Sequence, residues 1–349
     1  MAQHAFWLGG GLAMAASLIV ATPSAAQDAS EAQLYAAAKL EPSLNWYQVP
    51  LSQGTGERVA AAFSNKYPGL QVLAQRAPAQ TFFQKVTQEI QAGVPGADVF
   101  TSSVTGHLAA LKQQGQLLQY TPKSVATMLD VPGIKGVDPD GYYFGTILYL
   151  VTLVYNTRSL AAADAPHTLA DLADPKWSGK VALPNPGTSG TFGILTVQMA
   201  KTYGFDFFSK LAANRAIVVR SLPDVIATVQ SGEAPIGVAP ASMALDGKAH
   251  GQPIDVIYQS DGVMPAISVT GILKKTRSPN TAKLFMEFLH SSDMSRVVAA
   301  EYNEPLHADV APAPGAEPLA SVKIVLPSDA EVDAMLPKVV HAWRDAFGM

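Results

Sequence analysis

The sequence predicts an α/β fold with a mostly parallel sheet and helices on both faces, and three observations carry this prediction. Short apolar runs alternate with helical patterns over the first third of the chain. The same alternation returns after residue 180. Two longer runs, 142–156 and 266–273, are rich in β-forming residues and stand apart from the alternation.

The first third alternates regularly between the two kinds of segment. The expected strands are 44–49, 70–74 and 97–100, and the expected helices are 29–39, 57–66, 81–92 and 107–114. Residues 50–56, PLSQGTG, are expected to form a loop. Ligands of such sheets lie beyond the carboxyl ends of the strands, so residues 47–52 and 101–103 are expected at one rim.

Residues 142–156, YYFGTILYLVTLVYN, predict either a hairpin or one strand that crosses between two lobes. Beyond this run, the expected strands are 181–183, 216–220, 236–239 and 254–258, followed by a second crossover at 266–273. The expected helices are 221–230, 280–290 and 330–347, with Ser221 and Asp224 as a capping box. Residues 311–316 read as a surface linker.

The most informative stretch is 180–204, KVALPNPGTSGTFGILTVQMAKTYG, which reads as a strand, a turn and a helix. Thr188 or Ser189 is expected to cap the helix, and Gly204 stands where it should end. The small residues of the turn leave the first amides of the helix free to donate to a ligand. Together with the helix dipole they form a seat for an anion, although an ordinary capped turn has the same pattern. The phosphate-loop and nucleophile-elbow motifs are absent here.

Composition narrows the function class. The chain has 349 residues, a formal net charge of −4 and no cysteine. The mild acidity and the absence of a basic run argue against nucleic acid as a partner. The lack of cysteine excludes disulfides and thiolate metal sites.

The amino terminus predicts export. Residues 6–21 are almost wholly apolar or glycine, and small residues precede a cut after Ala26, so residues 1–26 read as a signal peptide. An uncleaved membrane anchor is the alternative, although the run is short for a membrane span. A periplasmic protein is the simplest expectation.

Several motifs in a fixed order resemble a known family. They are LVYNT, DLADPKWSGKVALPNPGTSGT, SGEAPIGVA and SPNTAKLFMEFLHSS, and they span essentially the whole mature chain. The chain is similar to the extracellular solute-binding proteins (family 1) of ABC importers, nearest the ferric-ion-binding group. This resemblance implies a two-lobed type II periplasmic-binding-protein fold with two crossover strands as the hinge. It places 27–147 and 270–320 in lobe 1, and 148–269 and 321–349 in lobe 2.

The resemblance transfers a binding site only in part. The ferric group holds iron with an adjacent tyrosine pair after the strand that here is 236–239, but this chain has Ser242 and Met243 there. The family's anion seat corresponds to Ser189, Gly190 and Thr191, and Arg220 takes the place of a neighbouring asparagine. A guanidinium suits a carboxylate or phosphonate, whereas a surface pair with Asp224 is the alternative.

Four further residues are candidates for the ligand site. Tyr47 and Tyr149 would add walls or hydroxyl donors, unless they pack within strands. Ser102 and Ser103 would donate from the first lobe, unless they cap a helix. The seven histidines show no metal-ligand spacing, so no metal and no cofactor are expected.

Together these features predict a periplasmic binding protein, not an enzyme, that captures a small organic anion. A carboxylate, including an aromatic one, comes first, and a phosphonate or sugar phosphate comes next. Ferric iron with a synergistic anion is the alternative, and a secreted hydrolase lacks a nucleophile–base pair. The expected partners are the anionic ligand and an inner-membrane ABC permease, with the protein itself a monomer.

Overall fold

We describe a computed structural model that covers residues 1, 30–94, 96–131 and 138–349. The predicted signal peptide therefore lies almost wholly outside the described residues. The helices are α1 (Glu31–Ala38), α2 (Gln53–Lys66), α3 (Ala79–Ala92), α4 (Thr105–Gln113), α5 (Gly190–Tyr203), α6 (Asp206–Ala213), α7 (Leu222–Ser231), α8 (Ala241–Ala249), α9 (Pro279–Leu289), α10 (Ser292–Ala300) and α11 (Asp329–Phe347). Short 3₁₀ helices are η2 (Lys123–Thr127), η3 (Ala162–Asp164), η4 (Ala170–Ala173), η5 (Pro175–Trp177) and η6 (Leu319–Ser321).

The strands form one sheet that runs through the whole molecule. They are β1 (Leu44–Gln48), β2 (Val72–Arg76), β3 (Val99–Ser102), β4 (Leu117–Leu118), β5 (Tyr143–Asn156), β6 (Val181–Pro184), β7 (Ile217–Val219), β8 (Ile236–Pro240), β9 (Ile254–Ile257) and β10 (Met264–Leu273). Their order is β2-β1-β3-β10-β5-β8-β6-β7, with β4 beside β10 and β9 beside β5.

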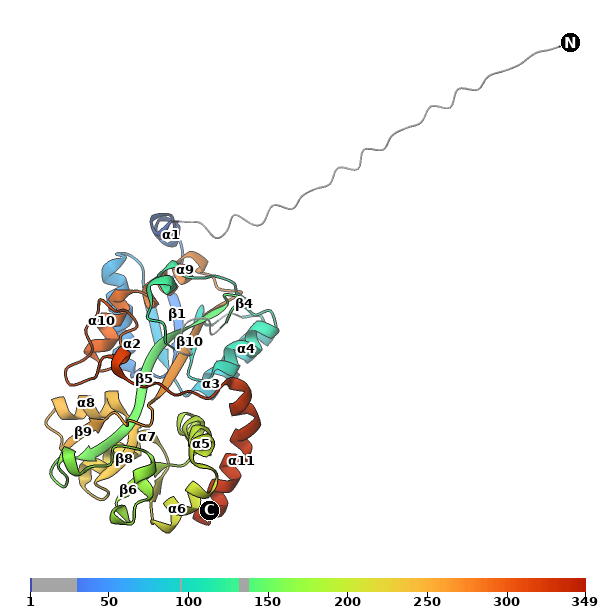
Figure 1. The fold of residues 1–349 in the computed structure, drawn as a ribbon. Helices are drawn as coiled ribbons and strands as arrows, with labels where there is room; N and C mark the ends of the chain where they lie inside the picture. The colour runs from blue at the N-terminus through green and yellow to red at the C-terminus, as the bar shows by residue number, and fades with distance from the viewer. Residues whose placement is uncertain (2–29, 95, 132–137) are drawn as a thin grey trace.

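Two long strands, β5 and β10, join the two halves of the molecule, and we call them the junction strands (Figure 1). The first half surrounds β1, β2 and β3, and the second half surrounds β6, β7 and β8. β5 is a single strand, not a hairpin. It pairs with β10 along residues 143–151, across the junction of the halves, and with β8 and β9 in the second half. Both junction strands run antiparallel to their neighbours, so the expectation of mostly parallel sheets needs correction. The sheet is mixed, because each half adds parallel strands to an antiparallel centre.

Separate apolar cores stabilise the two halves. One core of the first half gathers Trp46, Phe63, Ile147 and Phe285 under α2 and α9. The main core of the second half gathers residues of β6, α5 and α6 around Trp343 of α11. Each half therefore buries apolar surface in a core of its own.

The helix α11 fixes the position of α5. A Cβ on Gly193 would lie 3.0 Å from Leu336 Cδ1 of α11 and 3.1 Å from the Pro186 carbonyl oxygen, so the absence of a side chain permits this close approach. The rings of Phe192 and Trp343 meet edge to face, with centroids 5.5 Å apart. The first turn of α5 is therefore packed closely against α11.

Most of the predicted elements are present, and the differences have local causes. α2 begins at Gln53, inside the stretch predicted as a loop, because the Ser52 hydroxyl accepts the Thr55 amide at 3.0 Å and caps the helix. The helices α6, α8 and α10 were not predicted. Among the described residues, no helix has the length and apolarity needed to span a membrane.

Candidate functional site

The turn between β6 and α5 presents free donors at the start of a helix. Ser189 is the N-cap of α5, and its Oγ accepts the Phe192 amide at 3.4 Å. Among the residues that the structure describes, the amides of Gly190 and Thr191 have no hydrogen-bond partner. Gly190 is exposed and Ser189 and Thr191 are half-buried, so a ligand can reach these donors. The positive end of the α5 dipole adds to their attraction for an anion.

A junction strand contacts this helix start. The hydroxyl of Tyr149, on β5, lies 3.2 Å from Thr191 Oγ1, and either group can donate. Burial raises the pKa of Tyr149, so its hydroxyl keeps its proton. Two residues predicted for the site, 42 positions apart in the sequence, are thus in direct contact.

Arg220 lies beside the same turn. The Thr188 hydroxyl donates to the Arg220 carbonyl oxygen at 2.7 Å, which joins the end of β7 to the residues before α5. The Arg220 side chain is 83% exposed and its Nε lies 3.6 Å from Asp224 Oδ2. The guanidinium therefore forms the surface pair that the sequence left as the alternative, at the rim where the helix start lies.

In the first half, Ser102 and Ser103 follow β3, but they differ in surroundings. Ser102 is fully buried, with its Oγ 2.9 Å from His107 Nδ1 and 3.1 Å from the Val104 amide that it accepts. Burial lowers the pKa of His107, so this imidazole stays neutral near pH 7. Ser102 thus supports the start of α4, whereas Ser103 is half-buried.

Tyr47 packs within the first half and does not join the other candidates. Its ring stacks on Phe82 at 4.6 Å, and Lys85 Nζ lies 4.3 Å from its centroid. Its hydroxyl donates to Glu89 Oε1 at 2.9 Å. The strand-packing alternative therefore describes Tyr47 in this structure.

Ser242 and Met243 lie in the first turn of α8, which follows β8 directly. Ser242 is half-buried and Met243 is 41% exposed, an unusual exposure for a large apolar side chain. They offer a hydroxyl and an apolar surface at the carboxyl end of β8.

Sequence comparison identifies the class of protein that has this geometry. Residues 95–325, more than half of the chain, match the family described as "Bacterial extracellular solute-binding protein" (SBP_bac_6). The chain belongs to this family. Its members bind solutes and are not enzymes, which confirms that part of the sequence prediction.

The solute-binding protein also has similar relatives and solved structures. An uncharacterized protein of Haemophilus influenzae is 25% identical over 248 residues, which cover 68% of this chain and 70% of that one. Iron-bound HitA from Pseudomonas aeruginosa has a TM-score of 0.72 at 22% identity, covering 87% of this chain and 99% of its own. AfuA from Actinobacillus pleuropneumoniae, with fructose-6-phosphate bound, has a TM-score of 0.70 at 21% identity, covering 88% and 99%. At these identities the structures show a shared type II periplasmic-binding-protein fold.

The sequence did not point to two residues of this solute-binding protein that have buried, unpaired polar atoms. Gln48 Oε1 and Ser268 Oγ are buried and have no hydrogen-bond partner among the described residues. Their only sequence signal is a polar residue inside an apolar strand, which is too common to single them out.

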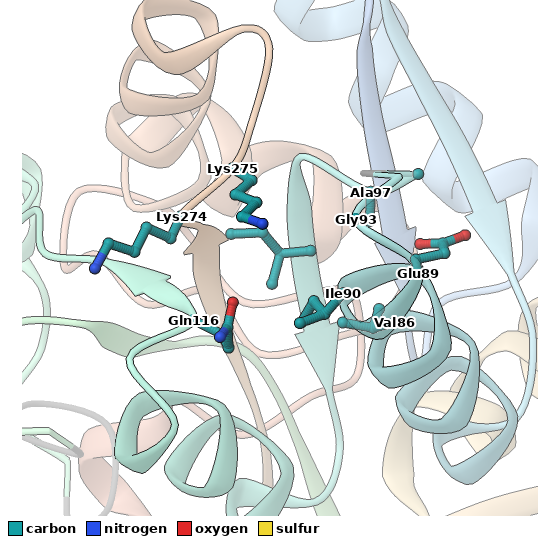
Figure 2. Close-up of a pocket in the computed structure, with 10 residues that line it drawn as sticks. Val86, Glu89, Ile90, Gly93, Ala97, Gln116, Lys274 and Lys275 are labelled. Atoms are coloured by element: carbon teal, nitrogen blue, oxygen red, sulfur yellow. The ribbon is translucent and has the colours of Figure 1, made fainter.

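The described residues offer no metal site, and the hollow in Figure 2 lies away from the start of α5. In the described part of the chain, no group of three or more His, Asp or Glu side chains could hold a metal ion. The hollow shown in Figure 2 lies between α3 and the far end of β10, and Glu89, Gln116 and Lys274 line it. It stands at the opposite end of β3 from Ser102.

Proposed function

We propose that this protein is the periplasmic binding component of an ABC importer and captures a small organic anion. A carboxylate, aromatic ones included, is the preferred ligand class, and an inner-membrane permease receives it. The protein works as a monomer whose two halves close around the ligand. Family membership supports the binding role, and the ligand class is inferred from the site.

The free amides at the start of α5 are the observation that supports an anionic ligand. Gly190 and Thr191 supply amide donors, and the Thr191 hydroxyl adds a third, held in place by Tyr149. Such donors bind a carboxylate or phosphate without a metal, since their partial charges sum with the dipole of a 14-residue helix. Arg220 would add a charge-assisted contact by leaving its exposed pair with Asp224.

Closure would follow from the two junction strands. We assign 27–147 and 270–320 to one moving body, and 148–269 and 321–349 to the other. The ligand favours the closed form because only that form lets both bodies contact it. Water excluded by closure would strengthen the charged contacts.

Sugar phosphates or phosphonates are the second candidate class. AfuA, which shares the fold, was solved with fructose-6-phosphate. Ferric iron with a synergistic anion is weaker: HitA was solved with iron, but this chain lacks tyrosine at 240–243.

A thermal-shift screen of the chain from Gln27 onward tests the proposal. The panel holds carboxylates, phosphonates, sugar phosphates, polyamines and ferric salts, and binding to the native state raises the melting temperature. We expect stabilisation by at least one organic anion and none by polyamines. Stabilisation by ferric salt alone, with stoichiometric iron in the purified protein, would contradict the proposal.

A further inference from the structure

We propose that Ser268 and Gln48 form the floor of the anion site and select a ligand that carries a hydroxyl group beside its anionic group. This inference rests on the proposed function and narrows its ligand class.

The register of the junction strands places Ser268 on the face that carries Tyr149. Ser268 pairs with Ile147, and Ala266 pairs with Tyr149. Alternate residues of a strand share a face, so Ser268, Ala266, Ile147 and Tyr149 all project to the same side. Tyr149 contacts Thr191 on this side, so the start of α5 lies over the face that carries Ser268.

The same face joins the two apolar cores. Ile147 belongs to the core of the first half, whereas Tyr149 and Ala266 pack against the core of the second. Ser268 therefore stands at the crossing between the halves, where a ligand enclosed by closure would rest.

The Ser268 hydroxyl is buried but makes no hydrogen bond within the described part of the chain. Ser268 is 1% exposed, yet its Oγ has no hydrogen-bond partner among the described residues. A buried hydroxyl without a partner is unfavourable, so its presence at Ser268 needs an explanation, and a bound ligand would supply one. Thr270, two residues along β10, shows the contrast, because its hydroxyl lies 2.7 Å from Thr101 Oγ1.

Gln48 extends this polar floor across the first half. Trp46 Nε1 donates to Thr101 Oγ1, and Thr101 contacts Thr270, so these side chains share a face with Gln48 and Ser268. The Gln48 amide nitrogen donates to the Leu51 carbonyl oxygen at 3.4 Å, which leaves Oε1 buried as an unpaired acceptor.

The chemistry of these two atoms specifies the ligand. A carboxamide oxygen accepts only, so the ligand must donate to it, and a bare carboxylate cannot. A hydroxyl can donate to Gln48 and exchange a hydrogen bond with Ser268. A hydroxycarboxylate or a sugar phosphate fits this set, with the anionic group at the helix start.

Titration calorimetry with pairs of anions that differ by one hydroxyl tests the inference. The pairs are malate with succinate, citrate with tricarballylate, mandelate with phenylacetate, and glycerol 3-phosphate with 1,3-propanediol monophosphate. For the pair that binds, we expect the parent to prefer the hydroxylated anion by at least about tenfold, because the deoxy anion leaves buried polar atoms unpaired. Ser268→Ala and Gln48→Met should each reduce that preference, because each removes one of the polar atoms that the hydroxyl would satisfy.

Thr270→Val is the matched control, because it removes a buried hydroxyl of the same strand that already has a partner. It should preserve the preference even if it lowers the melting temperature. Equal affinities of the parent for both members of a binding pair would overturn the inference while leaving the anion site intact. The inference would also be overturned if Ser268→Ala and Gln48→Met both kept the parent's preference for the hydroxylated anion. That result would mean that the two atoms bond to water and not to the ligand. Failure of every anion, including those of the thermal-shift panel, would instead contradict the proposed function.

Discussion

Glu304 is a buried acid near the junction between the halves. Its amide donates to the Leu148 carbonyl oxygen of β5 at 3.0 Å, and its side chain is 2% exposed. Oε2 has no partner among the described residues, and burial raises the pKa of Glu304 from 4.5 to about 7. His290, also buried, has its pKa lowered from 6.5 to about 4. Glu304 therefore makes stability fall as pH rises from 4.5 to 7, while His290 makes it rise between 4 and 6.5.

We expect Glu304→Gln to be more stable than the parent at pH 7.5, with a difference that disappears near pH 4. Between pH 4.5 and 7 the unfolded chain loses the Glu304 proton while the folded parent keeps it, which lowers the free energy of unfolding of the parent. The loss reaches about 3 kcal/mol above pH 7. The contribution of His290 is the same in both proteins and cancels in the difference between them. Urea unfolding from pH 4 to pH 8 measures the difference in the free energy of unfolding. A difference independent of pH would show that Glu304 ionises normally.

Arg220→Ala should weaken binding of an organic anion by about 10- to 100-fold, the loss of a charged hydrogen bond of about 1.5–3 kcal/mol. Arg215→Ala is the matched control, because Arg215 and Arg220 lie just before and just after β7. Both variants change the net charge equally. Calorimetry that gives the same dissociation constant for Arg220→Ala and the parent would remove Arg220 from the site.

Among single residues, the sequence predicted the start of α5 better than its surroundings. The cap at Ser189 follows from local chemistry, and Thr191 is in place as soon as the helix forms. The contact of Thr191 with Tyr149 depends on how β5 crosses the sheet, which the strand pattern alone does not specify. Tyr47 and Tyr149 look alike in the sequence, since each is a tyrosine in an apolar strand. In the structure Tyr47 packs on Phe82 and donates to Glu89, so it belongs to the core of the first half.

At the scale of elements, the start of α5 matters through both its cap and its free amides. Ser189→Ala should destabilise the protein by about 1 kcal/mol, and it should also weaken anion binding. Ser328→Ala is its control, because Ser328 caps α11 in the same half, with its Oγ accepting the Glu331 amide at 3.4 Å. Thermal melts and calorimetry should show similar destabilisation of both variants and weaker binding in Ser189→Ala alone. Equal binding in the two variants would separate the α5 cap from the ligand.

The elements that the sequence missed lack clear end signals. α8 follows β8 with no connecting turn, and its N-cap is Pro240, which offers no side-chain acceptor. α2 contains Gly54 and Gly56, which ordinarily favour loops, but the Ser52 cap begins the helix before them. Where caps and glycine stops agree with periodicity, as at α5, the prediction and the structure coincide.

At the scale of the whole molecule, the proposed function needs two halves that move about β5 and β10. A ligand that contacts both halves should make the molecule more compact. We expect the radius of gyration in small-angle X-ray scattering to decrease when a binding anion is added, and to stay unchanged with a polyamine. An unchanged radius at saturation would contradict closure but not binding.

A crystal structure of the protein with its bound ligand would show where the anionic group is held. We predict that the ligand's anionic group accepts hydrogen bonds from the Gly190 and Thr191 amides, with both halves in contact with it. A ligand bound in the hollow of Figure 2, with the start of α5 open to solvent, would contradict the account.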